Sequence, residues 1–241
     1  MSLEKLSAGD PERSSFEARE ATMEKTLKLG VLASGSGTNF QAILDSIECG
    51  GIPAVIRILL CNRPGAQAIE RARRHQVPVE VIEHKAHASR ELFDDRMVTV
   101  LREQEVDLVC LAGFDRLITP LFVRAFPGHI LNIHPALLPA FPGLHAQRQA
   151  LEYGVRLAGC TVHFVDELTD HGPIVLQAAV PVYDDDTEES LAERILAEEH
   201  RIYPEAIRLF AEGRLRIEGR HVRILDERGR GGGSLAIPRP R

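Results

Sequence analysis

Three polar side chains that could act together on a carbonyl group are the most informative feature of this sequence. Asn132 and His134 end an apolar run that begins at His129, and Asp170 lies much further along in a polar segment. Alternate side chains of an extended segment point to one face, so we expect Asn132 and His134 to share a cleft while Ile133 faces the core. An amide and an imidazole at one point suit an oxygen that gains negative charge in a transition state. Asp170 would orient the imidazole or relay a proton, although such residues also serve turns at strand ends.

A glycine-rich turn is the second candidate site. Residues 34–39 read Ser-Gly-Ser-Gly-Thr-Asn and stand between a predicted strand and a predicted helix. Small residues there let backbone N–H groups approach an anion at the positive end of a helix dipole; the alternative is a tight turn that only needs glycine. A nicotinamide dinucleotide is disfavoured, because Phe40 occupies the third fingerprint position and no acid ends the next strand, at 61–63. There is no Gly-Lys-Ser/Thr sequence either. A monophosphate on a small metabolite is the simplest ligand.

The composition limits the class of protein. The 241 residues are 44% hydrophobic and 27% charged, with a formal net charge of -6; this allows one sizeable core and disfavours a nucleic-acid partner. No apolar stretch approaches the roughly 20 residues that cross a bilayer, and the first 26 residues lack the apolar segment of a secretory signal. We therefore expect a cytoplasmic protein without a membrane partner. The four cysteines are widely spaced and lack metal-ligand spacing, which predicts reduced thiols and no metal site.

The elements that must position these groups alternate between short apolar runs and helical patterns, which is typical of βαβ units. Strands are predicted at 27–33, 55–61, 79–82, 106–112, 130–133, 160–165 and 174–182, with a terminal hairpin around Gly219. Helices are predicted at 38–49, at 66–75, from a cap at Ser89 to Leu101, at 145–153, and from 186 or 187 to 213. In the last helix, Asp186 and Glu189 have capping-box spacing and a break is expected before Pro204.

The predicted fold class is α/β, with an open, mostly parallel twisted sheet, helices on both faces and an antiparallel addition in the C-terminal half. The strand at 106–112 is nearly continuous in apolar character and is expected to be central. One catalytic domain is expected over 27–225. The segment 1–26 is polar, and 226–241 is rich in glycine and proline, so both are predicted to be flexible extensions without chemistry.

Five motifs occur together along the chain. They are Ser34–Asn39, Leu111–Leu117, Leu131–Pro139, Phe141–His145 and Asp170–Ile174. In combination they resemble the phosphoribosylglycinamide formyltransferase family, over about Leu27 to Gly219. The resemblance implies a Rossmann-like formyltransferase fold that moves the formyl group of 10-formyltetrahydrofolate to the amine of glycinamide ribonucleotide in de novo purine (IMP) biosynthesis. The ribonucleotide would bind the N-terminal half and the folate the C-terminal half.

The family's site residues carry over position by position. The catalytic set matches Asn132, His134 and Asp170, which implies direct attack of the amine through a tetrahedral intermediate, without a metal. The phosphate and ribonucleotide contacts match Gly37, Thr38, Asn39 and Glu199. The folate contacts match Arg90, Asp115, Arg116, Leu117, Ile118, Asn132, Asp166, Glu167, Leu168, Thr169 and Asp170. Without the resemblance, Arg90 and Glu199 would be interpreted as exposed helix residues, and His145 serves either an active-site loop or a helix cap.

Two residues depart from the family pattern. Asp115 stands where relatives tend to have an apolar residue, often Met, beside the folate pocket. Leu196 stands where some members have a Gln that contacts the substrate. These departures bear on folate affinity and on part of the substrate contact, whereas the three catalytic matches are intact.

Other functions are also compatible with the sequence. 10-Formyltetrahydrofolate hydrolase shares the catalytic domain, but its members carry an added N-terminal regulatory domain that about 26 polar residues could not form. Methionyl-tRNA formyltransferase shares the Asn/His/Asp set but has a further RNA-contacting domain. A non-catalytic phosphate-binding module is the alternative from another class. The expected partners are glycinamide ribonucleotide and folate, and a homodimer is left open.

Overall fold

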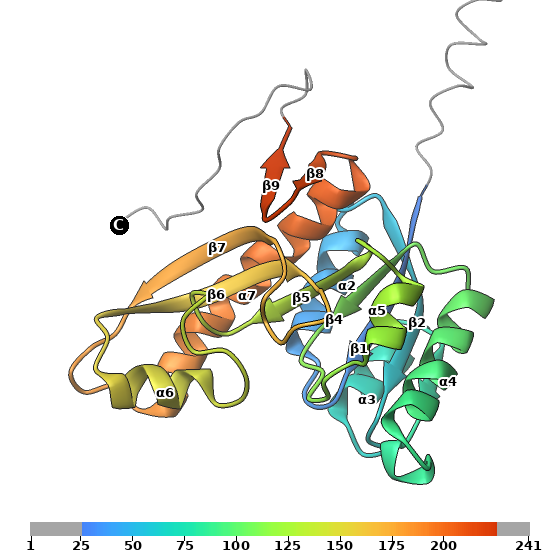
Figure 1. The fold of residues 1–241 in the computed structure, drawn as a ribbon, viewed down its shortest axis with the longest axis horizontal. Coiled ribbons are helices and arrows are strands. Elements are labelled where there is room, and N and C mark those ends of the chain that lie inside the picture. Colours follow the sequence, from blue (N-terminus) through green and yellow to red (C-terminus); the bar gives the residue numbers. More distant parts are fainter. Residues whose placement is uncertain (1–25, 226–241) are drawn as a thin grey trace, which may run out of the picture.

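One mixed β-sheet organises the computed structural model, which describes residues 26–225 (Figure 1). Within these residues nine strands are hydrogen-bonded in the order β3-β2-β1-β4-β5-β6-β7-β9-β8. They are β1 (Leu27–Ala33), β2 (Ala54–Cys61), β3 (Val79–Val81), β4 (Leu108–Leu111), β5 (Ile130–His134), β6 (Leu157–Phe164), β7 (Ile174–Pro181), β8 (Leu215–Glu218) and β9 (His221–Ile224). The segments predicted as flexible extensions lie outside the described residues, apart from Thr26.

The strand direction changes after β5. Strands β1 to β5 are all parallel to one another, whereas β6 is antiparallel to both β5 and β7. From β1 the chain runs outward through β2 to β3 and then crosses back to β4 on the other side of β1. This reversal of strand order places a crevice beyond the carboxyl ends of β1 and β4. The predicted fold class, the central position of β4, the antiparallel addition and the terminal hairpin are confirmed.

Helices cover both faces of the sheet. α2 (Thr38–Glu48), α3 (Gln67–Arg74), α6 (Ala146–Tyr153) and α7 (Glu188–Ala211) pack on one face, and α4 (Arg90–Glu103) and α5 (Pro120–Ala125) on the other. A single 3-10 turn, η1 (His84–Ala86), precedes α4. Figure 1 shows α4 and α5 side by side on one flank, and the β8–β9 hairpin beyond β7. In the part of the chain that the structure describes, no helix is both long and apolar enough to cross a membrane.

Alternating side chains of the central strands fill a core on each face. Cys110 and Leu131 pack with the α2 and α7 side, whereas Val109 and Ile130 pack with the α4 and α5 side. Full burial of a Leu, Ile or Val side chain contributes about 1.5–3 kcal/mol. Because helices cover both faces, these strands have no polar face, which accounts for the continuous apolar run in the sequence.

The helix α7 runs through Pro204, so the predicted break is wrong. A proline removes one helical hydrogen bond and crowds the preceding turn. Here Tyr203 and Ala206 on either side are fully buried, and the Tyr203 hydroxyl lies 3.0 Å from the carbonyl oxygens of both Leu111 and Leu131. Tertiary packing therefore holds the helix together on both sides of the proline.

The cap of α7 also differs from the predicted pair. Thr187 and Ser190 form the capping box, each side chain accepting from the other's backbone N–H at 3.2 and 3.0 Å. Asp186 instead binds the guanidinium of Arg194 through two hydrogen bonds of 2.7 and 2.8 Å. The sequence did not indicate α5, because six residues are too few to show a helical period.

Candidate active site

Residues from two distant segments meet beside β5. Asn132 and His134 lie on β5, and Asp170 lies in the loop between β6 and β7. Nδ1 of His134 is 3.5 Å from Oδ2 of Asp170, and the two side chains are only 6% and 12% exposed. Solvent therefore screens this contact little. The structure brings together the imidazole and the carboxylate that the sequence separates widely.

His163 on β6 connects Asn132 to Asp170. β6 is antiparallel to β5, and His163 is the cross-strand partner of Asn132. Nδ2 of Asn132 lies 3.1 Å from Nε2 of His163, and the same Nε2 lies 3.8 Å from Oδ1 of Asp170. Sequence reasoning missed His163. The only sequence feature that could have indicated His163 is its two-residue spacing from Thr161, which places both side chains on one face of the strand. Which face that is depends on the register between β5 and β6.

The proton position on His163 orients the Asn132 amide. Burial lowers the pKa of His163, while the Phe164 carbonyl and the Asp170 charge act to raise it. Nδ1 donates to the Phe164 carbonyl oxygen at 2.8 Å, so Nε2 of the neutral ring is an acceptor. Asn132 donates one amide hydrogen to it and keeps a second for another acceptor. The contact with His163 thus leaves one N–H of the Asn132 amide free beside a cavity that Asn132 lines.

Both ring nitrogens of His134 face oxygen atoms. Nε2 donates to the carbonyl oxygen of Phe141 at 2.9 Å, and Nδ1 faces Asp170. A ring protonated at both nitrogens satisfies both oxygens, whereas a neutral ring requires a bridging water or a protonated carboxyl. The arrangement suits a proton that moves between His134 and Asp170.

The segment Phe141–Gly143 holds both of these side chains. The Phe141 carbonyl accepts from His134, and the Gly143 N–H donates to Oδ2 of Asp170 at 2.7 Å. Phe141 and His145 are not glycines, yet both have left-handed φ angles, 53° and 59°. Such a conformation costs on the order of 1 kcal/mol or more and persists where the surroundings impose it. His145 is the N-cap residue of α6, without a side-chain capping bond.

A cavity opens beside Asn132 on the side of the β6–β7 loop, and we call it the folate-side cavity. Its walls combine apolar side chains with a polar loop: Leu111, Phe114, Arg116, Leu117, Ile118, Asn132, His163, Val165 and 166–170. Every predicted folate contact except Arg90 and Asp115 lines it. Apolar walls with convergent backbone polar groups fit a flat heteroaromatic ring.

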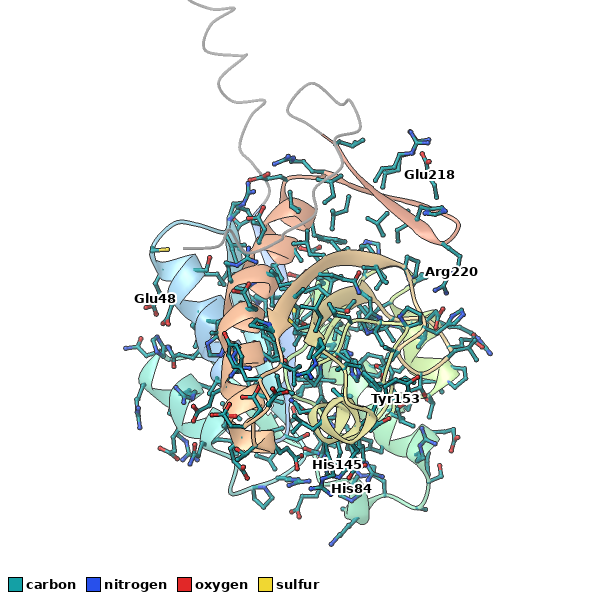
Figure 2. All side chains as sticks on the ribbon, turned by 90° about the vertical axis from the view of Figure 1, so that its left-hand side faces the viewer. Glu48, His84, His145, Tyr153, Glu218 and Arg220 are labelled. Carbon is teal, nitrogen blue, oxygen red and sulfur yellow. The ribbon has the colours of Figure 1, made fainter. Side chains whose placement is uncertain are left out.

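The β6–β7 loop, which lines this cavity, is held in place near His171 and Gly172. Arg220, labelled in Figure 2, extends from the β8–β9 hairpin and donates to the His171 carbonyl oxygen at 2.6 Å. At Gly172 a Cβ atom would stand 1.9 Å from the carbonyl oxygen of Phe164. Only glycine permits this approach, which accounts for the Asp-His-Gly-Pro motif.

The glycine turn between β1 and α2 has the geometry of an anion cradle, and we refer to it by that name. Gly37 is the N-cap residue of α2, with a left-handed φ of 68°. The backbone N–H groups of Gly37, Thr38 and Asn39 have no acceptor among the described residues. A Cβ on Gly37 would lie 2.7 Å from Cβ of Ala68, so α3 packs directly against the turn. Three free donors at a helix N-terminus fit a phosphate.

Glu199 reaches this cradle from α7. Nδ2 of Asn39 donates to Oε2 of Glu199 at 2.6 Å, although the two residues are 160 positions apart. Burial raises the pKa of Glu199, and the bond from Asn39 acts to lower it. Oδ1 of Asn39 is buried and has no partner within residues 26–225. The pair therefore retains acceptors for a hydroxyl or ammonium donor.

Asp115 lies with the cradle and does not line the folate-side cavity. Its carboxylate accepts from Nδ2 of Asn62 at 3.0 Å and pairs with Arg63, while its N–H donates to Oγ of Ser34 at 2.9 Å. Partial burial acts to raise the pKa of Asp115, but the bonds from Asn62 and Ser34 and the charge of Arg63 hold it below its ordinary value. The carboxylate stays charged, and its contacts with Asn62, Arg63 and Ser34 hold it on the side of the glycine turn.

Arg90 and Leu196, two further residues singled out in the sequence, lie at the edge of the candidate site. Arg90 begins α4 and donates to the Leu117 carbonyl oxygen at 2.8 Å, so it borders the folate-side cavity through Leu117. Leu196 is partly buried on α7, about one turn before Glu199.

A cavity of about 410 Å³ offers little chemistry. It lies between α6 and the segment after β5, its walls are mostly apolar, and Tyr153 is its single titratable side chain among the described residues. Within the described range no group of three or more His, Cys, Asp or Glu residues could hold a metal. The four cysteines are free, and all but Cys49 are buried.

The chain matches the family model described as Formyl transferase over residues 27–207. A protein of Escherichia coli (strain K12), "Phosphoribosylglycinamide formyltransferase", is 42% identical over 191 residues, which are 79% of this chain and 90% of that protein. The "Trifunctional purine biosynthetic protein adenosine-3" of Drosophila melanogaster is 44% identical over 216 residues, 85% of this chain. This chain spans only 16% of the length of that fly protein.

A crystal structure of glycinamide ribonucleotide transformylase 1 from Symbiobacterium toebii has the same fold. The TM-score is 0.82 and the sequence identity 60%, covering 83% of this chain and 95% of that chain.

Proposed function

Since this chain belongs to the formyl transferase family, we propose that it transfers the formyl group of 10-formyltetrahydrofolate to the amine of glycinamide ribonucleotide, in de novo purine biosynthesis. The names of two relatives that are similar over most of this chain support formyl transfer to glycinamide ribonucleotide. The observation that carries the proposal is the meeting of Asn132, His134 and Asp170 beside the folate-side cavity. An anion cradle in the same crevice supports a phosphorylated acceptor.

In the proposed reaction the amine nitrogen attacks the formyl carbon and forms a tetrahedral species. The second amide hydrogen of Asn132 meets the oxygen that becomes negative. His134 also donates a hydrogen bond to that oxygen. To do so it gives up its contact with the Phe141 carbonyl oxygen or with Asp170, because both of its nitrogens are otherwise engaged. The bond from the formyl carbon to N10 of the folate then breaks. The products are the formylated amine and tetrahydrofolate.

Two proton movements complete the balance. The attacking amine loses a proton, and the departing N10 gains one. Asp170 contacts His134 and Gly143 and lies within 3.8 Å of His163, so it is placed to accept a proton through water or to keep His134 charged. No metal is required for these steps, since the amide and the imidazole supply the stabilisation of the oxygen.

The acceptor is proposed to bind by its phosphate at Gly37, Thr38 and Asn39. Glu199 then contacts its hydroxyl or amine groups, and Asp115 adds a negative charge nearby. The pterin is proposed to bind in the folate-side cavity, against Leu111 and Phe114 and the 166–170 loop. A homodimer and a cytoplasmic location stay predictions.

The purified chain tests this proposal directly. Tetrahydrofolate formation and formylated product are measured together, with and without glycinamide ribonucleotide. Equal amounts of both products, formed only when the ribonucleotide is present, support the transferase. Formate and tetrahydrofolate formed without it would indicate a hydrolase, and neither product would indicate a phosphate-binding module.

A further inference from the structure

A polar groove begins at the glycine turn and follows α2. It has a volume of about 350 Å³, and Figure 2 shows α2 beside both α3 and α7, the two other helices that form its walls. The side chains that line it are Thr38, Gln41, Ala42, Asp45, Arg71 and His200. Because Thr38 belongs to the anion cradle as well, an anion in the cradle lies at the mouth of this groove. We call this space the α2 groove.

Arg71 lies directly beside the cradle. Its Nε donates to the carbonyl oxygen of Ser36 at 2.8 Å, and Ser36 is the residue before Gly37, so this bond holds the guanidinium against the turn. One terminal nitrogen, Nη1, lies 3.3 Å from Oε1 of Gln41. The other, Nη2, makes no hydrogen bond or ion pair within residues 26–225. Arg71 therefore keeps free donors and a positive charge next to the backbone N–H groups of the cradle.

Other charged side chains near the turn are paired, distant or buried. Arg63 pairs with Asp115. Asp45 lies about two turns along α2 from the cradle, where it accepts a hydrogen bond of 2.8 Å from a glutamine side chain. Glu199 is buried, and burial raises its pKa, which favours its neutral form. Among the described residues that line the α2 groove, Arg71 is thus the single permanent cation.

His200, on α7, lines the same groove, and one of its ring nitrogens lacks a partner. Nε2 is buried without a hydrogen bond in the part of the chain that the structure describes. Such atoms are few in native proteins, and a bound water, ion or polar ligand commonly accounts for them. Burial lowers the pKa of His200, the charge of Arg71 lowers it further, and Asp45 acts to raise it. An anion bound to Arg71 offsets the repulsion between the two basic groups, so it is expected to raise this pKa.

We propose that Arg71 is a phosphate-binding residue, which completes the anion cradle by donating to a phosphate oxygen through Nη2. This inference rests on the proposed function, because the phosphate belongs to the acceptor substrate. Arg71 is not among the ribonucleotide contacts that the family resemblance implies. The turn alone supplies about half an elementary charge from the helix dipole, whereas a phosphate monoester carries about −1.5 to −2 at pH 7. The guanidinium supplies the missing positive charge, and its hydrogen bond to a phosphate is charge-assisted.

Two substitutions of Arg71 test this role. For the parent, Arg71→Gln and Arg71→Lys, kcat and KM for glycinamide ribonucleotide are measured at saturating folate, together with the inhibition constant of inorganic phosphate. Arg74→Gln is the matched control, because Arg74 lies on the same helix, is exposed and makes no hydrogen bond or ion pair with a described residue. A second measurement needs no turnover: histidine NMR follows the pKa of His200 as inorganic phosphate is added, with the exposed His221 as the reference.

In Arg71→Gln, KM for the ribonucleotide and the inhibition constant of phosphate are each expected to rise about ten- to thirtyfold, because a hydrogen bond to a charged group is lost. The value of kcat stays near that of the parent. Lysine keeps the charge, so Arg71→Lys is expected to raise KM by roughly threefold or less, and Arg74→Gln matches the parent. If Arg71 only braced the turn through Nε, Arg71→Lys would be as impaired as Arg71→Gln. That result overturns the inference, as does a parental KM in Arg71→Gln.

The NMR titration separates this inference from the proposed function. In the parent, inorganic phosphate is expected to raise the pKa of His200 and to leave His221 unchanged, and in Arg71→Gln the rise is smaller at equal phosphate concentration. An unchanged His200 pKa in the parent overturns the inference even if formyl transfer is normal. Should the chain transfer no formyl group, the proposed function fails, and the response of His200 to inorganic phosphate still decides the role of Arg71.

Discussion

The two sides of the proposed site are assembled by different kinds of contact. The anion cradle consists of consecutive residues, Gly37 to Asn39, and offers backbone N–H groups at one strand-to-helix turn. The reaction centre consists of side chains from β5, β6 and the loop after β6, and it depends on Asn132 lying opposite His163. The cradle is therefore local in the chain, whereas the reaction centre is produced by strand register.

This difference predicts that variants of the cradle and variants of the reaction centre change different kinetic constants. Backbone donors bind a charge that is the same in the substrate and in the transition state, so damage to the cradle should raise KM. Side chains aimed at a developing oxyanion act mainly in the transition state, so damage to the reaction centre should lower kcat. Glu199 joins the two sides, since it reaches the cradle from the long helix α7.

The largest expected effect is in the reaction centre. Asn132→Ala and His134→Ala are each expected to lower kcat on the order of 10²–10³-fold, because each removes a proposed oxyanion donor. KM for both substrates should change little. Steady-state kinetics on each variant measures this, with His221→Ala as a folded control away from the site. A variant with near-parental kcat would contradict the proposed role, since the residue would then not act in the transition state.

A cradle variant should act on KM. Gly37→Ala places a methyl group against Ala68 at a φ of 68°, so the turn must shift. KM for the ribonucleotide is expected to rise about tenfold, as for the loss of roughly 1.4 kcal/mol of binding, while kcat at saturation stays close to the parent. The measurement is kinetics at varied ribonucleotide concentration.

Gly50→Ala is the matched control for this variant. Gly50 also has a positive φ, 77°, but a Cβ there meets nothing within 4 Å. Both variants are expected to lose about 1 kcal/mol of stability from the strained conformation, and only Gly37→Ala should change KM. Equal KM values in the two variants would contradict the cradle.

Glu199→Gln is expected to change how the stability of the protein depends on pH. The pKa of Glu199 is raised on folding by burial, so its contribution to stability is fully present below the unfolded value near 4.5 and is lost as pH rises through the folded value. Glutamine has no such loss. The variant is therefore expected to gain stability relative to the parent as pH rises, by about 2–4 °C in Tm if roughly 1 kcal/mol is recovered.

The measurement is a series of thermal melts of the parent and of Glu199→Gln at pH values above 4.5, together with KM for the ribonucleotide. Because Glu199 is proposed to contact the substrate, KM for the ribonucleotide should rise while stability increases. A variant that melts with the same pH dependence as the parent would show that Glu199 is not the buried acid responsible.

The smallest expected effect concerns Asp115. Asp115→Met restores the apolar residue common in relatives and removes the contacts with Asn62 and Arg63. We expect KM for the ribonucleotide to change roughly two- to fivefold, the scale of one partly exposed polar contact, with KM for the folate unchanged. A larger change in folate KM would place Asp115 functionally on the folate side, as its sequence position first indicated.

Much of the fold was predictable, because the apolar runs of a sheet covered on both faces are continuous and easily found. The predictions were wrong or incomplete where tertiary contacts outweigh the local conformational preference of the residues. Pro204 breaks an isolated helix, but the buried residues around it keep α7 intact. His163 looked like any polar residue of a half-buried strand, because only pairing with β5 reveals the face on which it lies.

The order of residues along the chain was enough to indicate the cradle and the pairing of Asn132 with His134 on one strand face. Both follow from backbone geometry over a few residues. Only the tertiary structure decided that Asp170 lies against His134, that His163 orients the Asn132 amide, and that Glu199 meets Asn39. Those contacts join segments far apart in the chain, and long-range packing and strand register, which no short stretch of sequence specifies, place them within hydrogen-bonding reach.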